Sequence, residues 1–204
     1  MNKFAITIAR QYGSGGILIG KKLSEDLQVA LYDKNLIELA AQKSGLCKEF
    51  IKKSDEKLPL SGFLSGIGDA ICSGFGIEYA RNINDEIFKI QSEIIRSLAQ
   101  KESAIFLGRC ADYVLREHKN ILKIFVCANL EDRVKTVMQL SSISEKEALK
   151  EIEQNDKQRD RYYRHYTNIE RGSAKYYDLC VNTSSLGIEA SADFVKEFAV
   201  KKLK

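Results

Sequence analysis

The chain opens with an unbroken apolar run and then changes to a helical period. Residues 4–9 (Phe-Ala-Ile-Thr-Ile-Ala) have the composition of a strand that is buried on both faces of a parallel sheet. Behind a glycine-rich stretch, apolar residues recur at the spacing of one helix face: Ile19, Leu23 and Leu27. A second short strand is expected over residues 29–32, followed by a helix over about 34–43. The order strand, helix, strand, helix is typical of a parallel α/β sheet.

Residues 46–82 break this pattern. They begin with a charged segment, contain the only proline of the chain, Pro59, and end in a glycine-rich, partly apolar run. That run is too apolar for a solvated linker. We therefore predict an inserted subdomain over 46–82 and a core formed by residues 1–45 and 83–204.

The alternation of strands and helices resumes after the insertion. Hydrophobic periodicity predicts a helix over 83–98, strands over 104–107, 121–128 and 178–182, and helices over 130–140, 144–158 and 188–203. Ser144 and Glu147 form the S-x-x-E pattern of a capping box at the start of one of these helices. Together with the opening, these elements predict an α/β fold with a five-stranded parallel sheet flanked by helices.

Composition and charge narrow the class of protein. The apolar fraction of 44% and the charged fraction of 29% are ordinary globular values. The five cysteines are scattered without a C-x-x-C pair, which favours a reducing compartment, and with only two histidines the chain is a poor candidate for a metal centre. A net charge of +4 fits an anionic ligand but does not indicate a nucleic-acid protein. Because the start lacks the pattern of a signal peptide and no apolar run has membrane-spanning length, we expect a cytoplasmic protein with no membrane partner.

The glycine-rich stretch after the first strand is the main candidate site. A turn such as residues 13–16 presents backbone N–H groups and a helix N-terminus to an anion, usually a phosphate. Two registers of the motif G-x-x-x-x-G-K-[ST] compete here. The register over residues 15–21 puts three branched apolar residues in the turn and interrupts the helical stripe, so we reject it. In the other register, Arg10 stands at the first glycine, Gly16 at the lysine and Ile17 at the metal-binding hydroxyl.

Two alternatives to a phosphate loop remain. A dinucleotide-binding G-x-G-x-x-G motif is nearly present from Gly13, but Leu18 stands at its last glycine. Asp33 lies about twenty residues further on, where that motif has its ribose-binding acid. The other alternative is a tight turn between strand and helix that binds no ligand.

Several segments, taken together, resemble the cytidylate-kinase-like proteins, a branch of the P-loop nucleoside monophosphate kinases. They are residues 6–16 (Ile-Thr-Ile-Ala-Arg-Gln-Tyr-Gly-Ser-Gly-Gly), 19–20 (Ile-Gly), 31–34 (Leu-Tyr-Asp-Lys), 106–112 (Phe-Leu-Gly-Arg-Cys-Ala-Asp), 177–178 (Tyr-Asp) and 182–183 (Asn-Thr). The resemblance covers nearly the whole chain and is weakest across the insertion. It implies a three-layer P-loop NTPase fold, a helical insertion that binds the monophosphate, and an arginine-bearing lid at about 141–175. The implied reaction transfers the γ-phosphoryl group of ATP to a nucleoside monophosphate, with Mg²⁺.

An arginine cluster supplies the candidate catalytic residues. Phosphoryl transfer needs positive charge around the moving group, and arginines on a closing lid supply it while they exclude water. The resemblance places Arg159, Arg161 and Arg164 on this lid. The ordinary alternative is a solvated charged face. The tyrosines between these arginines also suggest nucleic-acid binding, which the weak net charge and the other motifs disfavour.

The remaining candidates lie at the ends of the predicted strands, where ligands of open α/β sheets collect. Asp33 either contacts a substrate hydroxyl or metal-bound water, or caps the next helix. The forked guanidinium of Arg109 suits the phosphate of the acceptor, and the resemblance puts Asp112 beside it. The residues expected to bind ATP are Gly13, Ser14, Gly15, Gly16, Ile17, Arg133 and Thr183.

The absent lysine leaves three hypotheses. Removing a comparable preorganised donor typically costs about a hundred- to a thousandfold in rate, so an active enzyme needs a substitute. In the first hypothesis Arg10 reaches the phosphates in place of the lysine. In the second the chain is a non-catalytic nucleotide-binding or sensing module, and in a third, weaker one it is an NAD(P)-dependent enzyme. The acceptor and the oligomeric state stay open.

Overall fold

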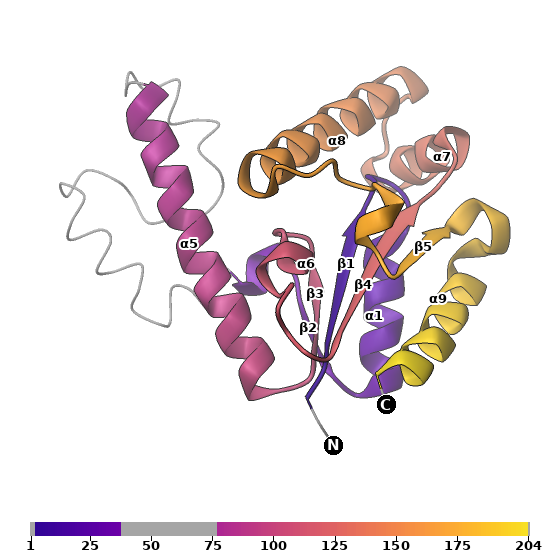
Figure 1. The fold of residues 1–204 in the computed structure, drawn as a ribbon. Coiled ribbons are helices and arrows are strands. Elements are labelled where there is room, and N and C mark those ends of the chain that lie inside the picture. Colours follow the sequence, from indigo (N-terminus) through magenta and orange to yellow (C-terminus); the bar gives the residue numbers. More distant parts are fainter. Residues whose placement is uncertain (1–2, 38–76, 204) are drawn as a thin grey trace. The chain divides into compact units, whose positions relative to one another are not determined.

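The structure is a computed structural model that describes residues 3–37 and 77–203 (Figure 1). The chain divides into two compact units, residues 1–33 with 99–204 and residues 34–98. The first unit contains the sheet and every candidate site residue named above. The second unit includes the start of helix α5 (Ile77–Lys101).

The first unit is built on a five-stranded sheet in which every pairing is parallel. Its strands are β1 (Ala5–Arg10), β2 (Ala30–Tyr32), β3 (Ala104–Leu107), β4 (Ile121–Cys127) and β5 (Leu179–Asn182), in the order β2-β3-β1-β4-β5. The register pairs Ile8 of β1 with Leu107 of β3 on one side and with Ile124 of β4 on the other. The loop after β1 therefore leaves the middle of the sheet, between the carboxyl ends of β3 and β4. Open α/β sheets bind their ligands at such an edge.

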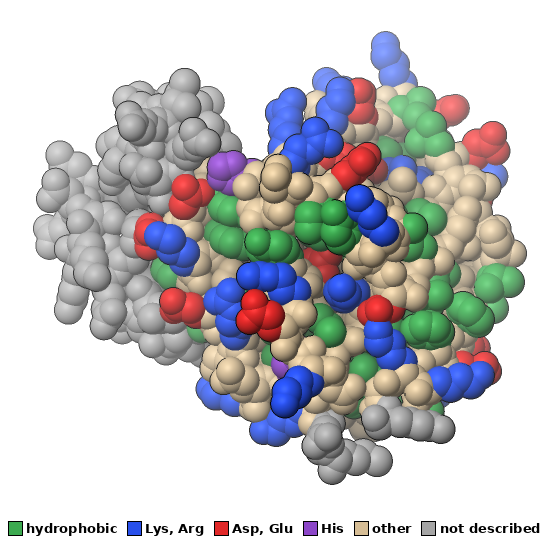
Figure 2. All heavy atoms as spheres, viewed as in Figure 1, with side chains coloured by type: hydrophobic (Ala, Val, Ile, Leu, Met, Phe, Trp, Pro, Cys, Tyr) green, Lys and Arg blue, Asp and Glu red, His purple; other side chains and the backbone are tan. Residues whose placement is uncertain are grey.

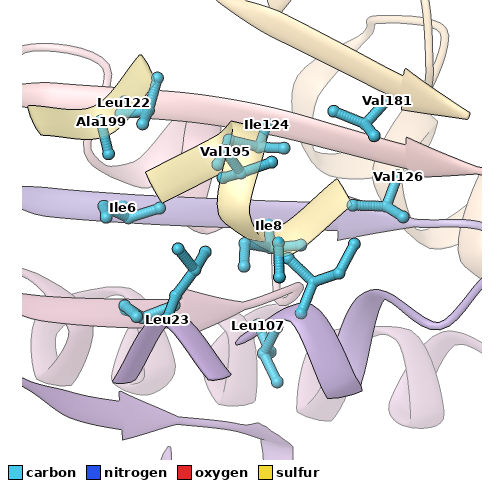
Figure 3. Close-up of a cluster of buried hydrophobic side chains, with 13 residues drawn as sticks. Ile6, Ile8, Leu23, Leu107, Leu122, Ile124, Val126, Val181, Val195 and Ala199 are labelled. Carbon is cyan, nitrogen blue, oxygen red and sulfur yellow. The ribbon is translucent and has the colours of Figure 1, made fainter. Parts of the chain in front are cut away.

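Helices α1 (Gly16–Leu27) and α9 (Thr183–Lys202) form a core with the strands (Figure 3). The side chains of this core are buried, and the figure labels Ile6, Ile8, Leu23, Leu107, Leu122, Ile124, Val126, Val181, Val195 and Ala199. Each large aliphatic side chain among them contributes roughly 1.5–3 kcal/mol on full burial. The packing fixes the ends of β1, β3 and β4 relative to one another, and the candidate site lies at those ends.

The remaining elements of the first unit are α6 (Ala111–Val114), α7 (Leu130–Ser141), α8 (Glu145–Thr167) and a 3₁₀ turn, η2 (Ala174–Tyr176). A small second core joins α7 to α8 through Val134, Val137, Ala148 and Ile152. The predicted capping box at the start of α8 is confirmed. The hydroxyl of Ser144 accepts from the backbone N–H of Glu147, and the carboxylate of Glu147 accepts from the backbone N–H of Ser144 at 2.9 Å.

The predicted five-stranded parallel sheet flanked by helices is confirmed, and the main correction concerns α8. The helix expected over 144–158 continues to Thr167, so the arginine cluster lies on this helix and not after it. No glycine or proline interrupts the segment, so the helix can continue. The predicted helix was too short because charged side chains replace the apolar residues whose spacing indicates a helix. At the other end of the unit, α9 begins at Thr183 and passes through a non-helical residue, Gly187 (φ 76°), before the stretch that was expected to be helical.

Some predictions fall on residues that the structure does not describe. Residues 34–37 are helical as expected, but the predicted end of that helix lies outside the described residues. The inserted subdomain over 46–82 lies outside them except for its last turns, which belong to α5. This domain assignment therefore stays a prediction. Among the described residues, no helix is both long enough and apolar enough to cross a membrane.

Candidate functional site

The glycine-rich loop between β1 and α1 is shaped by two left-handed glycines. Gly13 has φ 78° and Gly15, the N-cap of α1, has φ 76°. A Cβ atom at Gly13 would lie 2.9 Å from the carbonyl oxygen of Arg133, and one at Gly15 would lie 2.8 Å from Cδ1 of Ile188. Both positions thus require glycine. The first turn of α1 contains no acidic residue and has no side-chain cap, so its N–H groups and the positive end of the helix dipole suit an anion.

The start of α1 agrees with the register that puts Gly16 at the lysine position. Ile19 and Leu23 are fully buried against the sheet, as the helical stripe required. Lys21 is exposed in the second turn of the helix, away from the loop. The Gly20-Lys21 pair is therefore part of the helix and does not form the phosphate-binding turn.

Two hydroxyl groups near the loop donate hydrogen bonds to backbone carbonyls. Ser14 is buried, and its hydroxyl donates to the carbonyl of Gln11 at 2.9 Å, with the carbonyl of Val126 at 3.2 Å. Thr183, at the start of α9, is also buried and donates to the carbonyl of Ser14 at 3.0 Å. Ile17 is 46% exposed in the first turn of α1. Ser14 and Thr183 thus hold the loop in place, whereas a ligand would meet backbone N–H groups.

Arg10, the last residue of β1, occupies the space that a lysine at position 16 would need. A Cβ atom at Gly16 would lie 2.9 Å from Cβ and 3.2 Å from Cδ of Arg10. At the far end of the side chain, a Cβ atom at Gly108 would lie 2.8 Å from Nη1 of Arg10. The side chain therefore runs from the loop to the end of β3, and it needs glycine at both places. A long cation therefore lies beside the glycine-rich loop from the side of β1, whereas the usual phosphate-binding motif places it on α1.

Arg10 is partly buried, and its Nε atom is fully buried. Among the described residues this Nε has no hydrogen-bond partner. Burial first, and then the charges of Arg159, Arg171 and Arg109, lower the pKa of Arg10 to about 10, while Asp33 opposes the shift. The group stays charged at neutral pH. An unpaired buried donor costs about 1–3 kcal/mol, and an anion at this place would relieve that cost.

Two further arginines converge on the backbone of Arg10. Its carbonyl oxygen accepts from Nη1 of Arg171 at 2.6 Å and from Nη1 of Arg159 at 3.2 Å. The side chain of Arg171 is 7% exposed and also donates to Asp160 at 2.7 Å and to Asp156 at 3.2 Å. Sequence reasoning missed Arg171, because it lies in a loop without periodicity. A weak signal in the sequence was the neighbouring Gly172, which the structure shows to be left-handed (φ 85°), with no room for a Cβ atom beside the ring of Phe125.

Arg133, on α7, contacts both the loop and α8. It is buried, its Nε donates to the carbonyl of Tyr12 at 2.7 Å, and it forms an ion pair with Asp156. Asp156 also accepts from the backbone N–H of Tyr12 at 3.0 Å. The guanidinium of Arg133 is thus occupied by protein groups. Of the lid candidates on α8, Arg159 reaches this network, whereas Arg161 and Arg164 are exposed.

The turn after β3 has a strained backbone. Gly108, Arg109 and Cys110 have φ values of 73°, 54° and 53°, so three successive residues are left-handed and two of them carry side chains. Left-handed conformation costs a non-glycine residue roughly 1–2 kcal/mol, and strain of this kind clusters at functional sites. The guanidinium of Arg109 lies 5.7 Å from the ring centroid of Tyr162 on α8. The turn therefore holds Arg109 between the end of β3 and α8.

The two candidate carboxylates have different surroundings. Asp112 is buried and accepts from the hydroxyl of Tyr163 at 2.7 Å, and burial raises the pKa of its carboxyl group. It joins α6 to α8 and faces protein groups. Asp33 is only partly buried, at the carboxyl end of β2, and its charge is close enough to raise the pKa of Arg10.

Basic side chains are prominent on the surface around the candidate site, with acidic ones among them. Figure 2 shows that Lys and Arg side chains gather over α8 and around α6 on the face it presents. The part of the chain that the structure describes contains no group of three or more His, Cys, Asp or Glu residues that could hold a metal ion. The arrangement is one of backbone N–H groups and guanidinium groups around the end of β1, which suits a phosphorylated ligand.

Comparisons with known proteins place the chain among kinases of related sequence and fold. The chain is 26% identical to a cytidylate kinase of Methanosarcina barkeri over 194 residues, which cover 94% of this chain and 93% of that protein. It is 27% identical to a cytidylate kinase of Methanothrix thermoacetophila over 179 residues, which cover 87% of each chain. An uncharacterized protein of Eubacterium ventriosum has the same fold, with a TM-score of 0.74 and 24% identity over 97% of this chain and 99% of that chain. A shikimate kinase of Bacteroides thetaiotaomicron also shares it, with a TM-score of 0.51 and 11% identity over 96% and 97% of the two chains.

A model of the cytidylate kinase-like family matches residues 5–185. The family and the P-loop kinase fold predicted from the sequence are both confirmed. They identify the protein as a phosphotransferase of the nucleoside monophosphate kinase-like class, with a nucleotide or another small molecule as its substrate. With most of its length matched by the family model, this chain belongs to the cytidylate kinase-like family.

Proposed function

We propose that the protein transfers the γ-phosphoryl group of ATP to a nucleoside monophosphate, and that Arg10 takes the part of the phosphate-loop lysine. The observation that carries this proposal is the reciprocal fit of Arg10 and Gly16. A Cβ atom at position 16 would lie 2.9 Å from Cβ of Arg10, so the chain can carry a long cation at one of the two positions but not at both. The loss of the lysine is thereby matched by a cation at the same end of β1.

The proposed roles follow from the positions of the side chains. The backbone N–H groups of the loop and of the first turn of α1 bind the phosphates of ATP, with Arg10 beside them. Arg159, which already contacts the backbone of Arg10, supplies further positive charge around the transferring group. Arg109, on the strained turn after β3, binds the phosphate of the acceptor with two parallel hydrogen bonds. The cytidylate kinases to which the chain is similar suggest CMP, dCMP or UMP as the acceptor.

Mg²⁺ is expected to enter this reaction with the nucleotide. When bound, it neutralises charge on the phosphate oxygens. The loop and the first turn of α1 do not suit direct ligation, because the hydroxyl of Ser14 is engaged by backbone carbonyls and Ile17 offers no oxygen. We therefore assign the coordination of the ion to phosphate oxygens and water, as is common for magnesium.

The test is an assay of ADP release in the presence of ATP, Mg²⁺ and each common nucleoside monophosphate. Wild-type protein should turn over with at least one of CMP, dCMP and UMP, and Arg10→Ala should lose about a hundred- to a thousandfold in kcat/KM. Lys21→Ala is the matched control, because it removes a cation from the exposed side of the same helix and should leave turnover unchanged. Full activity of a folded Arg10→Ala variant would contradict the assignment. ATP binding without turnover on any acceptor would support a nucleotide-sensing module instead.

A further inference from the structure

We propose that the site binds ATP as a metal-free polyanion at least as tightly as it binds the magnesium complex. The inference rests on the proposed function, since it concerns the same phosphate site. It differs from what the wider P-loop fold implies, where a lysine and a metal-ligating hydroxyl together receive the magnesium nucleotide. In this chain both of those groups are absent, and guanidinium groups take over the charge.

The first observation is the chemistry of the loop's side chains. The hydroxyl of Ser14 is buried and donates to the carbonyl of Gln11, with the carbonyl of Val126 also in reach. The next two side chains of the first turn, Ile17 and Leu18, are about half exposed and contain no oxygen. Hard cations such as Mg²⁺ require oxygen ligands. The side chains of the first turn therefore provide no ligand for the metal ion.

The second observation is the excess of positive charge at the end of β1. Arg10 has a buried Nε that finds no hydrogen-bond partner in the described part of the chain. Arg159, Arg171 and Arg109 are all close enough to lower the pKa of Arg10, so each of them adds to the local positive potential. Four guanidinium groups thus lie near the end of β1, and within residues 3–37 and 77–203 the Nε donor of Arg10 meets no acceptor.

The third observation concerns the carboxylates that face this cluster. Asp156 forms ion pairs with Arg133 and Arg171, and Asp160 pairs with Arg171. Asp33 raises the pKa of Arg10, but its effect is smaller than those of burial, Arg159 and Arg171, which all lower that pKa. Among the charged groups that shift the pKa of Arg10, the arginines thus outweigh the single carboxylate, which favours an anionic ligand beside Arg10.

The expected effect of Mg²⁺ on the affinity for ATP follows from these charges. The free triphosphate is more negative than its magnesium complex, and a cluster of guanidinium groups with no direct metal ligand attracts the more negative form. A site with a ligating hydroxyl gains a metal–oxygen bond that offsets this difference. In this site the metal removes charge from the ligand and offers no protein bond in return.

The experiment is isothermal titration calorimetry of wild-type protein with the β,γ-imido analogue of ATP at fixed ionic strength. One arm contains excess Mg²⁺ and the other contains EDTA. We expect the Kd in EDTA to equal the Kd in Mg²⁺ or to be up to about tenfold lower. A Kd that is reproducibly higher in EDTA than in Mg²⁺ overturns the inference and leaves the proposed function intact. Failure to bind in both arms overturns both.

Three variants make the test specific. Arg10→Met, which keeps a long side chain without the charge, should weaken binding more in EDTA than in Mg²⁺, whereas Lys21→Met should change neither arm. The triple variant Arg10→Gly, Gly16→Lys, Ile17→Thr puts the lysine and the hydroxyl back into the first turn. It should bind the magnesium complex more tightly than the free analogue, which reverses the wild-type order. If it keeps the wild-type order, the charge argument is wrong.

Discussion

At the scale of single residues, Arg10 and Gly16 are best understood as one exchange. In the usual phosphate loop the cation stands at the start of the helix and a glycine at the end of the strand. Here the two residue types have changed places, and the close approach of the Arg10 stem to the Cβ direction of Gly16 explains why both changes come together. The effect of a substitution at position 10 on stability therefore depends on the residue at position 16, and the reverse also holds.

A lysine at position 16 is expected to destabilise the protein unless Arg10 is removed with it. Gly16→Lys places Cβ 2.9 Å from Cβ of Arg10, and overpacking of this kind typically costs about 1–3 kcal/mol. The double variant Arg10→Gly, Gly16→Lys removes the clashing atoms and should recover most of that loss. Urea denaturation of the wild type, both single variants and the double variant measures the coupling. Purely additive effects would show that the two positions are independent.

Asp112 should give the protein a pH-dependent stability that an amide lacks. Burial raises the pKa of this carboxyl group, so the folded protein keeps the proton at pH values where the unfolded chain has lost it. The folded state binds more protons in that window, and the contribution of Asp112 to the free energy of unfolding falls as the pH rises from about 4, the ordinary value for aspartate. Asp112→Asn should remove this part of the slope, whereas the exposed Asp193→Asn should preserve it. Denaturation curves over a pH series decide the matter, and identical slopes for wild type and Asp112→Asn would refute the assignment.

At the scale of elements, α8 connects all parts of the site. Its first turns pack on α7, its middle carries Asp156 and Arg159, and its last turns carry the tyrosines that meet Asp112 and Arg109. One continuous helix over Glu145–Thr167 therefore couples the phosphate loop to the strained turn after β3. A change in the position of α8 would move both ends of the site together.

Asp156 is the residue through which α8 is fixed to the loop. It accepts from the backbone N–H of Tyr12 and pairs with both Arg133 and Arg171, whose side chains are each only 7% exposed. Removing one partner of a buried ion pair typically costs about 3–5 kcal/mol. Asp156→Ala should therefore lower the free energy of unfolding by roughly that amount, while Asp160→Ala, at an exposed position of the same helix, should cost about 1 kcal/mol or less. Equal losses in chemical denaturation would contradict this view of α8.

At the scale of the whole molecule, the hydrophobic pattern was enough for the sheet and most helices but not for the site. Strand β1 and the buried stripe of Ile19 and Leu23 could be predicted, because buried positions are occupied by apolar residues at a regular spacing. The contact of Arg171 with Arg10 joins residues 161 positions apart, and no periodic pattern in the sequence indicates it. The left-handed backbone at Arg109 could not be predicted either, because arginine is not a residue type that favours this conformation.

Binding at this site should stabilise the entire first unit, because the loop, α8 and the turn after β3 are coupled. A ligand that binds only the folded state adds about 2.7 kcal/mol at a concentration of 100 times its Kd. For a chain of this size that corresponds to a rise in Tm of roughly 5–11 °C. The β,γ-imido analogue of ATP should produce the rise in wild type and in Lys21→Ala, and a much smaller one in Arg10→Met at the same concentration. A thermal-shift series with EDTA and with Mg²⁺ measures it. An equal rise in Arg10→Met would mean that the backbone of the loop binds the phosphates without help from the arginine.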